Sequence, residues 1–89
     1  MNTTEIKARL YDIDREIPKQ IEHILNIARL IKEEVNRKDV MSGDFEILNV
    51  GIMIEKVYLL AEKGLSAKED LKRLTEEKKR LETLLREGG

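Results

Sequence analysis

The chain has 89 residues, of which 39% are charged and 40% hydrophobic, and its net charge is −1; this composition predicts one small, soluble helical domain. The balanced charge argues against nucleic acid and against an anionic membrane surface as partners, because both attract a basic face. The lack of cysteine excludes a disulfide framework, a thiol nucleophile and a thiolate metal site. No apolar run reaches about 18 residues, so no membrane span is expected, and no signal peptide is predicted; the localisation is left open.

An apolar stripe predicts a first helix over about residues 4–38. Its steps of three and four average about 3.6, the α-helical period. Pro18 lies within the stripe and lacks the N–H group that would bond to the Asp14 carbonyl. Because the stripe keeps its phase, a single helix kinked at Pro18 is favoured over a break at which Pro18 begins a new helix. The stripe consists of Ile6, Leu10, Ile13, Ile17, Ile21, Ile24, Ala28, Ile31 and Val35.

The segment NRKDVMSGD, residues 36–44, predicts the first connection, and a second helix is expected over about residues 43–63. Ser42 is a candidate N-cap, and Asp44 places negative charge at the positive end of the next helix. Gly64 is predicted to end that helix in the left-handed conformation.

A strand is the alternative for the middle of the chain, since Val50, Ile52 and Ile54 alternate around Gly51. These β-branched residues favour extended structure. The sequence contains no second convincing strand to pair with this one, so the helix is favoured.

The last helix is predicted over residues 66–87. Ser66 and Glu69 form a capping box, and a narrow leucine stripe follows among charged residues. The sequence therefore predicts a single all-α domain over residues 1–89: an antiparallel three-helix bundle, with four helices if Pro18 breaks the first. The stripe consists of Leu71, Leu74, Leu81, Leu84 and Leu85.

Residues that could perform chemistry are few. His23 is the only histidine, and one nitrogen donor makes a transition-metal site improbable. Asp12, Asp14 and Glu16 alternate like calcium ligands, but no glycine turn or closing glutamate completes a calcium loop. No glycine-rich phosphate loop is present. We therefore predict no catalytic residue, no metal and no cofactor.

The second predicted helix is apolar on two sides, which is more than a three-helix bundle needs. An uncovered apolar patch of this kind usually marks an interaction site. On a helical wheel, one side carries Ile47, Val50, Ile54, Val57, Tyr58 and Ala61. The other side carries Phe45, Leu48, Ile52, Met53, Leu59 and Leu60.

The first helix has a similar excess. Ile27 and Leu30 lie off its main stripe with His23 and Glu34 close by, and Tyr11 lies on another flank. Two interpretations stand: these side chains form a binding face, or the long helix packs both on the second helix and on a symmetry mate.

Residues 66–87 combine strong helix formers with a capping box, whereas residues 1–63 carry irregular choices such as Pro18 and Gly51. This combination resembles a de novo designed helical bundle whose surface is constrained by more than folding. An ordinary natural three-helix protein is the alternative.

The segments RLYDID, residues 9–14, and ILNV, residues 47–50, resemble parts of the first and third helices of short-chain cytokines of the common-gamma-chain, interleukin-21-like family. LYD is also similar to designed interleukin-2 mimetics. The chain departs from the family in lacking cysteine and in carrying a proline within the first helix. The resemblance implies a receptor-binding surface that contains Arg9, Tyr11, Asp12, Asn49 and Val50.

The sequence thus predicts a non-catalytic protein-binding module, such as an engineered helical binder or a cytokine-like receptor ligand. The partner is a protein, for example a cell-surface receptor, and no small-molecule substrate is evident. A self-assembling homodimer is the alternative, and a small helical enzyme comes third. The candidate partner-binding residues are Arg9, Tyr11, Asp12, His23, Ile27, Leu30, Phe45, Asn49 and Met53.

Overall fold

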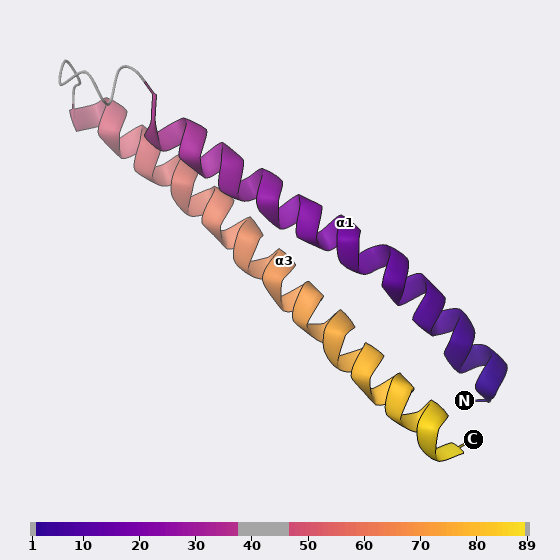
Figure 1. The fold of residues 1–89 in the computed structure, drawn as a ribbon. Coiled ribbons are helices and arrows are strands. Elements are labelled where there is room, and N and C mark those ends of the chain that lie inside the picture. The colour runs from indigo at the N-terminus through magenta and orange to yellow at the C-terminus, as the bar shows by residue number, and fades with distance from the viewer. Residues whose placement is uncertain (1, 38–46, 89) are drawn as a thin grey trace.

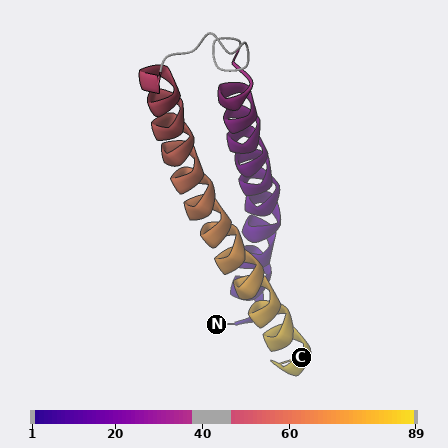
Figure 2. The same ribbon diagram turned by 90° about the vertical axis from the view of Figure 1, so that its left-hand side faces the viewer.

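The computed structural model describes residues 2–37 and 47–88, and within these ranges the chain forms two α-helices (Figure 1). Helix α1 spans Thr3–Val35 and helix α3 spans Ile47–Gly88. Figure 1 and Figure 2 show the helices side by side and antiparallel, with the N-terminal end of α1 beside the C-terminal end of α3. The molecule is a helical hairpin.

The hairpin is a rod of 66 × 15 × 14 Å with a radius of gyration of 19.8 Å. A compact domain of this length has a radius of gyration of about 12 Å. The all-α class predicted from the sequence is correct, but the three-helix bundle is wrong, because the described residues contain two helices and form no third layer.

The error lies at Gly64 and Ser66, where the sequence predicts a helix end and a new N-cap. Helix α3 passes through both residues and joins the segments predicted as separate helices over 43–63 and 66–87. An interior glycine costs a helix only about 1 kcal/mol relative to alanine. Gly64 faces α1, since a Cβ atom built on it would lie 3.4 Å from Cγ2 of Ile27. The glycine is therefore explained by helix packing and not by a chain reversal.

Helix α1 is continuous through Pro18, so the predicted single first helix is confirmed and a break is not found. Its first turn is capped by Asn2, whose side chain accepts a hydrogen bond from the backbone N–H of Glu5 at 2.8 Å. At the other end, the N–H of Asn36 donates to the carbonyl of Lys32. The predicted connection with its N-cap at Ser42 lies outside the described residues.

A single row of buried or half-buried residues on each helix forms the contact between them, which we call the seam. On both helices its steps alternate between four and three, a mean of about 3.5, as in a coiled coil. On α1 the seam consists of Ile6, Leu10, Ile13, Ile17, Gln20, Ile24, Ile27, Ile31 and Glu34. On α3 it consists of Val50, Met53, Val57, Leu60, Gly64, Ala67, Leu71, Leu74, Lys78, Leu81 and Leu85.

The seam differs from the 3.6-residue stripe expected for α1. Ile21 and Val35, which the stripe places in the core, are 43% and 40% exposed, and Gln20 and Glu34 occupy the seam instead. A straight stripe drifts around the helix by about 20° per heptad relative to a 3.5-residue repeat. Contact with one long partner helix requires the 3.5-residue repeat, which moves these aliphatic side chains to the flank.

The best-buried part of the seam lies near the chain termini. There Ile6, Ile13 and Leu81 form a cluster against which neighbouring seam residues pack. Ile27 and Ala67 are the other buried apolar residues among those described. A hairpin can bury only this narrow strip, because each helix has just one neighbour.

Replacing Gly64 with alanine tests the continuous helix. In an interior helical position Gly64→Ala stabilises the fold by up to about 1 kcal/mol, whereas at a left-handed helix end it destabilises. The added Cβ meets Ile27 at an ordinary contact distance. Chemical denaturation measures the change, and Gly51→Ala, which has open space around it, is the matched control. A loss of stability at Gly64 alone would contradict the continuous helix.

Truncation of Ile13 tests the seam. Ile13 is fully buried, whereas Ile52 on α3 is exposed. We expect Ile13→Ala to reduce the free energy of unfolding by about 3 kcal/mol and Ile52→Ala by less than about 1 kcal/mol. Equal losses in denaturant titrations would show that the 3.5-residue seam is not the core.

Candidate functional site

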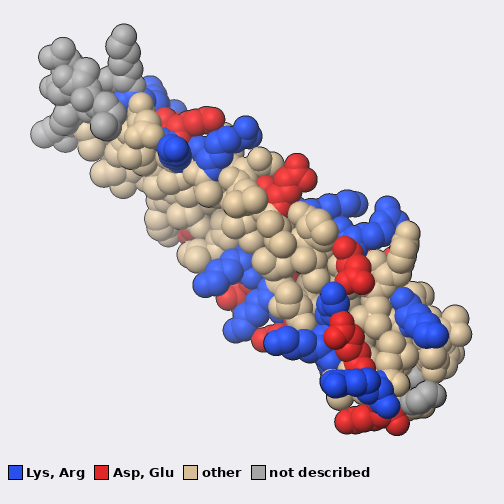
Figure 3. Space-filling view, in the orientation of Figure 1, with Lys and Arg blue, Asp and Glu red and all other residues tan. Residues whose placement is uncertain are grey.

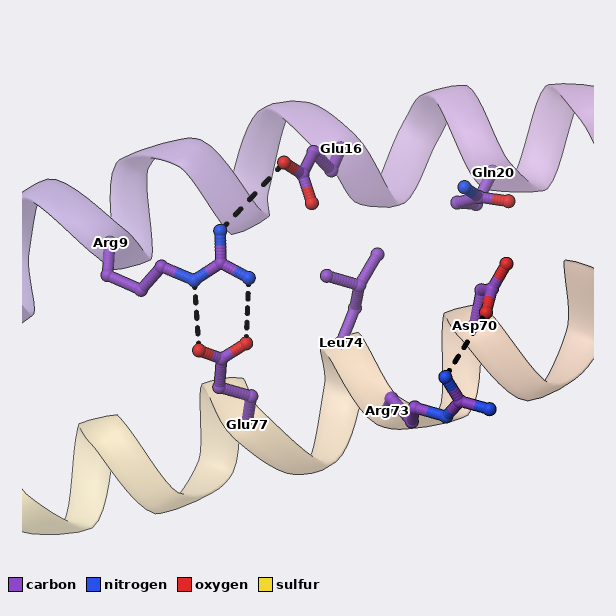
Figure 4. A pocket seen from close by; sticks show the side chains of 7 residues that line it. All are labelled: Arg9, Glu16, Gln20, Asp70, Arg73, Leu74 and Glu77. Atoms are coloured by element: carbon purple, nitrogen blue, oxygen red, sulfur yellow. Dashed lines mark hydrogen bonds and ion pairs between the residues drawn. The ribbon is translucent and has the colours of Figure 1, made fainter.

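The hairpin has two edges on either side of the seam, and one of them is polar. This polar edge is made by residues that directly precede a seam residue. Most of them are charged or polar, and its exposed apolar members are Leu30, Ile52, Leu59 and Leu84. Arg9 of α1 and Glu77 of α3 meet there, with Nε donating to Oε2 at 2.9 Å and Nη2 donating to Oε1 at 2.8 Å (Figure 4). A second ion pair joins Arg9 to Glu16 at 3.9 Å. The bidentate pair fixes the register of the two helices near the termini.

The ion pairs along the seam shift the pKa values of some of the charged groups that form them. The hydrogen bond from Arg9 holds the pKa of Glu77 below its usual value, and the reciprocal bond raises the pKa of Arg9. Lys78 lies 2.8 Å from Asp14, and this hydrogen bond and charge raise the pKa of Lys78. Arg9, Glu77 and Lys78 are therefore held in their charged forms at neutral pH.

The grooves along the polar edge are lined by charged and polar side chains. One contains Arg9, Glu16 and Glu77, with Asp70 and Arg73 further along (Figure 4). Asp70 and Arg73 lie 3.7 Å apart as an ion pair on α3. The groove contains two guanidinium groups and three carboxylates, so it offers no excess of positive charge for an anionic ligand.

The opposite edge is apolar in the half of the hairpin nearer the connection. This apolar edge consists of residues that directly follow a seam residue, and all are exposed except Ala61, which is half-buried. Leu25, Tyr58 and Leu65 are 63%, 61% and 62% exposed. The members on α1 are Ile21, Leu25, Ala28 and Val35, and those on α3 are Ile54, Tyr58, Ala61 and Leu65.

The two rows lie on the same edge. Arg9 and Glu77 both precede a seam residue and touch each other, so residues that follow the seam on either helix share the other side. Two contacts define how the helices are aligned along the rod. Gly64 lies beside Ile27, and Lys56 forms an ion pair with Glu34 at 3.9 Å. In this register Leu25 lies at the same height along the rod as Leu65, Ala28 at that of Ala61, and Val35 at that of Ile54.

Figure 3 shows the consequence on the surface: uncharged atoms run across both helices in the half nearer the connection, whereas charged side chains gather toward the termini. A shallow groove in the uncharged half is lined by Ile54, Glu55, Tyr58 and Leu59. A hydrogen bond with Glu62 raises the pKa of Tyr58, so the tyrosine hydroxyl stays protonated at neutral pH. The groove can accept an apolar side chain, and the Tyr58 hydroxyl provides a polar group at its rim.

The residues predicted to bind a partner are scattered over this structure. Ile27 is buried and Met53 half-buried, and both belong to the seam. Leu30 is exposed, and so is His23, which lines a groove on the polar edge with Lys63 and neighbouring residues. Part of the predicted excess apolar surface therefore exists, since Leu30, Leu48, Ile52 and Leu59 are exposed, whereas Ile27 and Met53 lie in the seam.

The residues implied by the cytokine resemblance are also spread apart. Tyr11 is exposed with the Arg15 guanidinium 5.7 Å from its ring centroid, and Asp12 is exposed on the same part of α1. Asn49 is exposed at the start of α3, which lies at the opposite end of the rod. Arg9 is held by Glu77, and Val50 is half-buried in the seam. Phe45, another of the predicted partner-binding residues, lies outside the described residues.

Sequence reasoning missed the apolar edge because it assigned Ile21, Ala28 and Val35 to the core and left Leu25 and Leu65 without a role. The available signal was their spacing. Both rows repeat every three or four residues in parallel with the seam, which marks a second helical contact.

Comparisons with known proteins add no relative. A scan against protein-family models, a search of curated proteins and a search of solved structures all found no match. Over residues 2–37 and 47–88, no group of three metal-ligating side chains is placed to hold an ion. Neither described helix has the length and apolar character needed to cross a membrane.

The Arg9–Glu77 pair predicts a pH dependence. Because folding lowers the pKa of Glu77 below its usual 4.5, its contribution is fully present above pH 4.5 and is lost as the pH falls through the lowered pKa. The two side chains are 34% and 27% exposed, so Glu77→Gln should cost about 1 kcal/mol or less at pH 7.

Unfolding titrations of the native chain and of Glu77→Gln across pH 2–7 measure this contribution. The difference between the two should shrink toward zero in the acid range. Glu33→Gln, at an exposed position on α1, is the control and should track the native chain. A difference that persists at pH 2 would mean that the charge of Glu77 is not responsible.

Proposed function

We propose that this chain is a non-catalytic protein-binding module that docks a helical partner on its apolar edge. The observation that carries the proposal is the spacing of that edge. On α3 its residues 54, 58, 61 and 65 are separated by steps of four, three and four. On α1 the corresponding positions are 21, 25, 28, 32 and 35, of which only Lys32 is charged. This 3.5-residue repeat is the pattern that knobs-into-holes packing between helices requires.

Energetics support a covered apolar edge. Leu25, Leu65 and Ile54 are each more than half exposed on the hairpin. Burying such side chains is favourable by about 25 cal/mol for each Å² of apolar surface removed from water. Ala28 and Ala61 lie level with one another between the larger side chains, so a partner helix can approach closely at the middle of the edge.

The polar grooves support binding over catalysis. They run between partly exposed, mutually paired side chains such as Arg9 and Glu77, whereas enzyme sites enclose their substrates in largely apolar clefts. A receptor ligand built on Tyr11, Asp12 and Asn49 would need a contiguous surface, but these residues lie toward opposite ends of the rod. The apolar edge is the larger continuous surface, and we assign the contact to it.

Site-specific photocrosslinking tests the proposal. A photoreactive amino acid at Leu65, on the apolar edge, should give a covalent adduct of higher mass in the cells that produce the protein. The same group at Leu84, which is also exposed but lies near the C-terminal end of α3, is the matched control and should give much less. Mass spectrometry of the adduct identifies the crosslinked chain. If Leu65 gives no more adduct than Leu84, the proposed binding role is wrong.

A further inference from the structure

The area of the hairpin indicates how much surface its partner must cover. Its accessible surface is 6976 Å² for a mass of 10.4 kDa. A compact monomer of that mass exposes about 5,400 Å². The excess of about 1,600 Å² exceeds the roughly 800 Å² that each partner buries in a standard protein interface. Covering it would bring the chain to the exposure of an ordinary folded protein.

Resting on the proposed function, we infer that the partner on the apolar edge is a second copy of this chain. Two hairpins related by a two-fold axis along the rod form an antiparallel four-helix bundle, in which α1 of each copy packs against α3 of the other. Each helix then uses its first seam within the hairpin and its apolar edge between hairpins.

The register supports this self-pairing. Within one hairpin Leu25 is level with Leu65, and Val35 is level with Ile54. A two-fold axis along the rod keeps these levels, so the α1 row of one copy meets the α3 row of the other from the level of Leu25 and Leu65 to that of Val35 and Ile54. The alanines at 28 and 61 also meet, and their small side chains let the four helices approach at that point.

Charges beside the apolar edge are complementary in the same arrangement. Beside residues 28–35 of α1 the flanking side chains are basic, Arg29 and Lys32, whereas on the facing part of α3 they are acidic, Glu55 and Glu62. Arg29 is level with Glu62 of the second copy, and the Lys32 ammonium can reach the acidic side chains next to Tyr58 while its stem covers apolar surface. Unlike charges therefore meet when α1 faces α3, and like charges meet when α1 faces α1.

The apolar edge covers only the half of the rod nearer the connection, and this favours one orientation of the two copies in the dimer. Beyond Leu65, the positions that follow the seam on α3 are Lys68, Lys72 and Thr75, and beyond Ile21 on α1 the row includes Asp14. A fully overlapping head-to-tail dimer would bury the apolar half of each copy against this charged half. The connections of the two copies therefore lie at the same end, and the charged halves extend beyond the contact.

Analytical ultracentrifugation of the full chain tests the inference. We expect about twice 10.4 kDa at micromolar concentration. Leu25→Asp should give a helical monomer, because Leu25 is exposed on the hairpin and buried in the dimer. Leu30→Asp, an exposed leucine of the same helix on the polar edge, should remain dimeric. Circular dichroism confirms that both variants keep their helices.

A charge exchange tests the pairing of α1 with α3. Arg29→Glu should weaken the dimer at least several-fold, and adding Glu62→Arg in the same chain should restore it. Spin labels at position 5 near the N-terminus should give a short distance between copies when the connections lie at the same end. A long distance across the rod would overturn the proposed orientation.

The outcomes separate this inference from the proposed function. A native chain that is monomeric at all concentrations, or a Leu25→Asp variant as dimeric as the native chain, overturns the homodimer. If Leu65 then photocrosslinks to a different protein, the binding role stands and only the identity of the partner is wrong.

Discussion

The fold depends on one constraint: the two long helices must keep contact along a rod, and the described residues contain no third element to support them. That contact requires apolar residues every 3.5 positions, because an undistorted 3.6-residue stripe would rotate away from its partner. Because the seam follows this repeat, it includes the polar residues Gln20, Glu34 and Lys78, and Gly64 lies inside a helix. The same repeat leaves Ile21, Ala28 and Val35 on the flank.

The polar edge and the apolar edge of the hairpin make different interactions. On the polar edge, Arg9 and Glu77 form a bidentate pair that specifies the register at the terminal end of the hairpin. Such a pair is worth little in stability when it is partly exposed, but it discriminates against shifted alignments. The apolar edge lies nearer the connection, and its side chains are exposed on the hairpin except for the half-buried Ala61. A contiguous apolar surface of this kind is typical of an interaction site.

A lone hairpin buries too little to account for so much apolar sequence. Among the described residues, the fully buried side chains are Ile13 and Leu81, and domains of this size are marginal even when compact. The proposed four-helix bundle of two copies would resolve the mismatch, because each helix would gain a second neighbour and each row of apolar residues a partner. In this arrangement association and stability are linked, since the dimer removes surface from water that the monomer exposes.

The sequence by itself determined the all-helical class. It favoured a single first helix through Pro18 over a break, and it indicated an excess of apolar surface. Local propensity and periodicity suffice for these features. Only the tertiary structure decided that Gly64 and Ser66 lie within a helix and that Ile27 faces the seam while Ile21 faces outward. A glycine can end a helix, or it can let a neighbouring helix approach closely. The difference between a 3.6-residue and a 3.5-residue repeat, about 0.1 residue per turn, decides which side chains are buried. Both choices depend on the partner helix, which no local pattern describes.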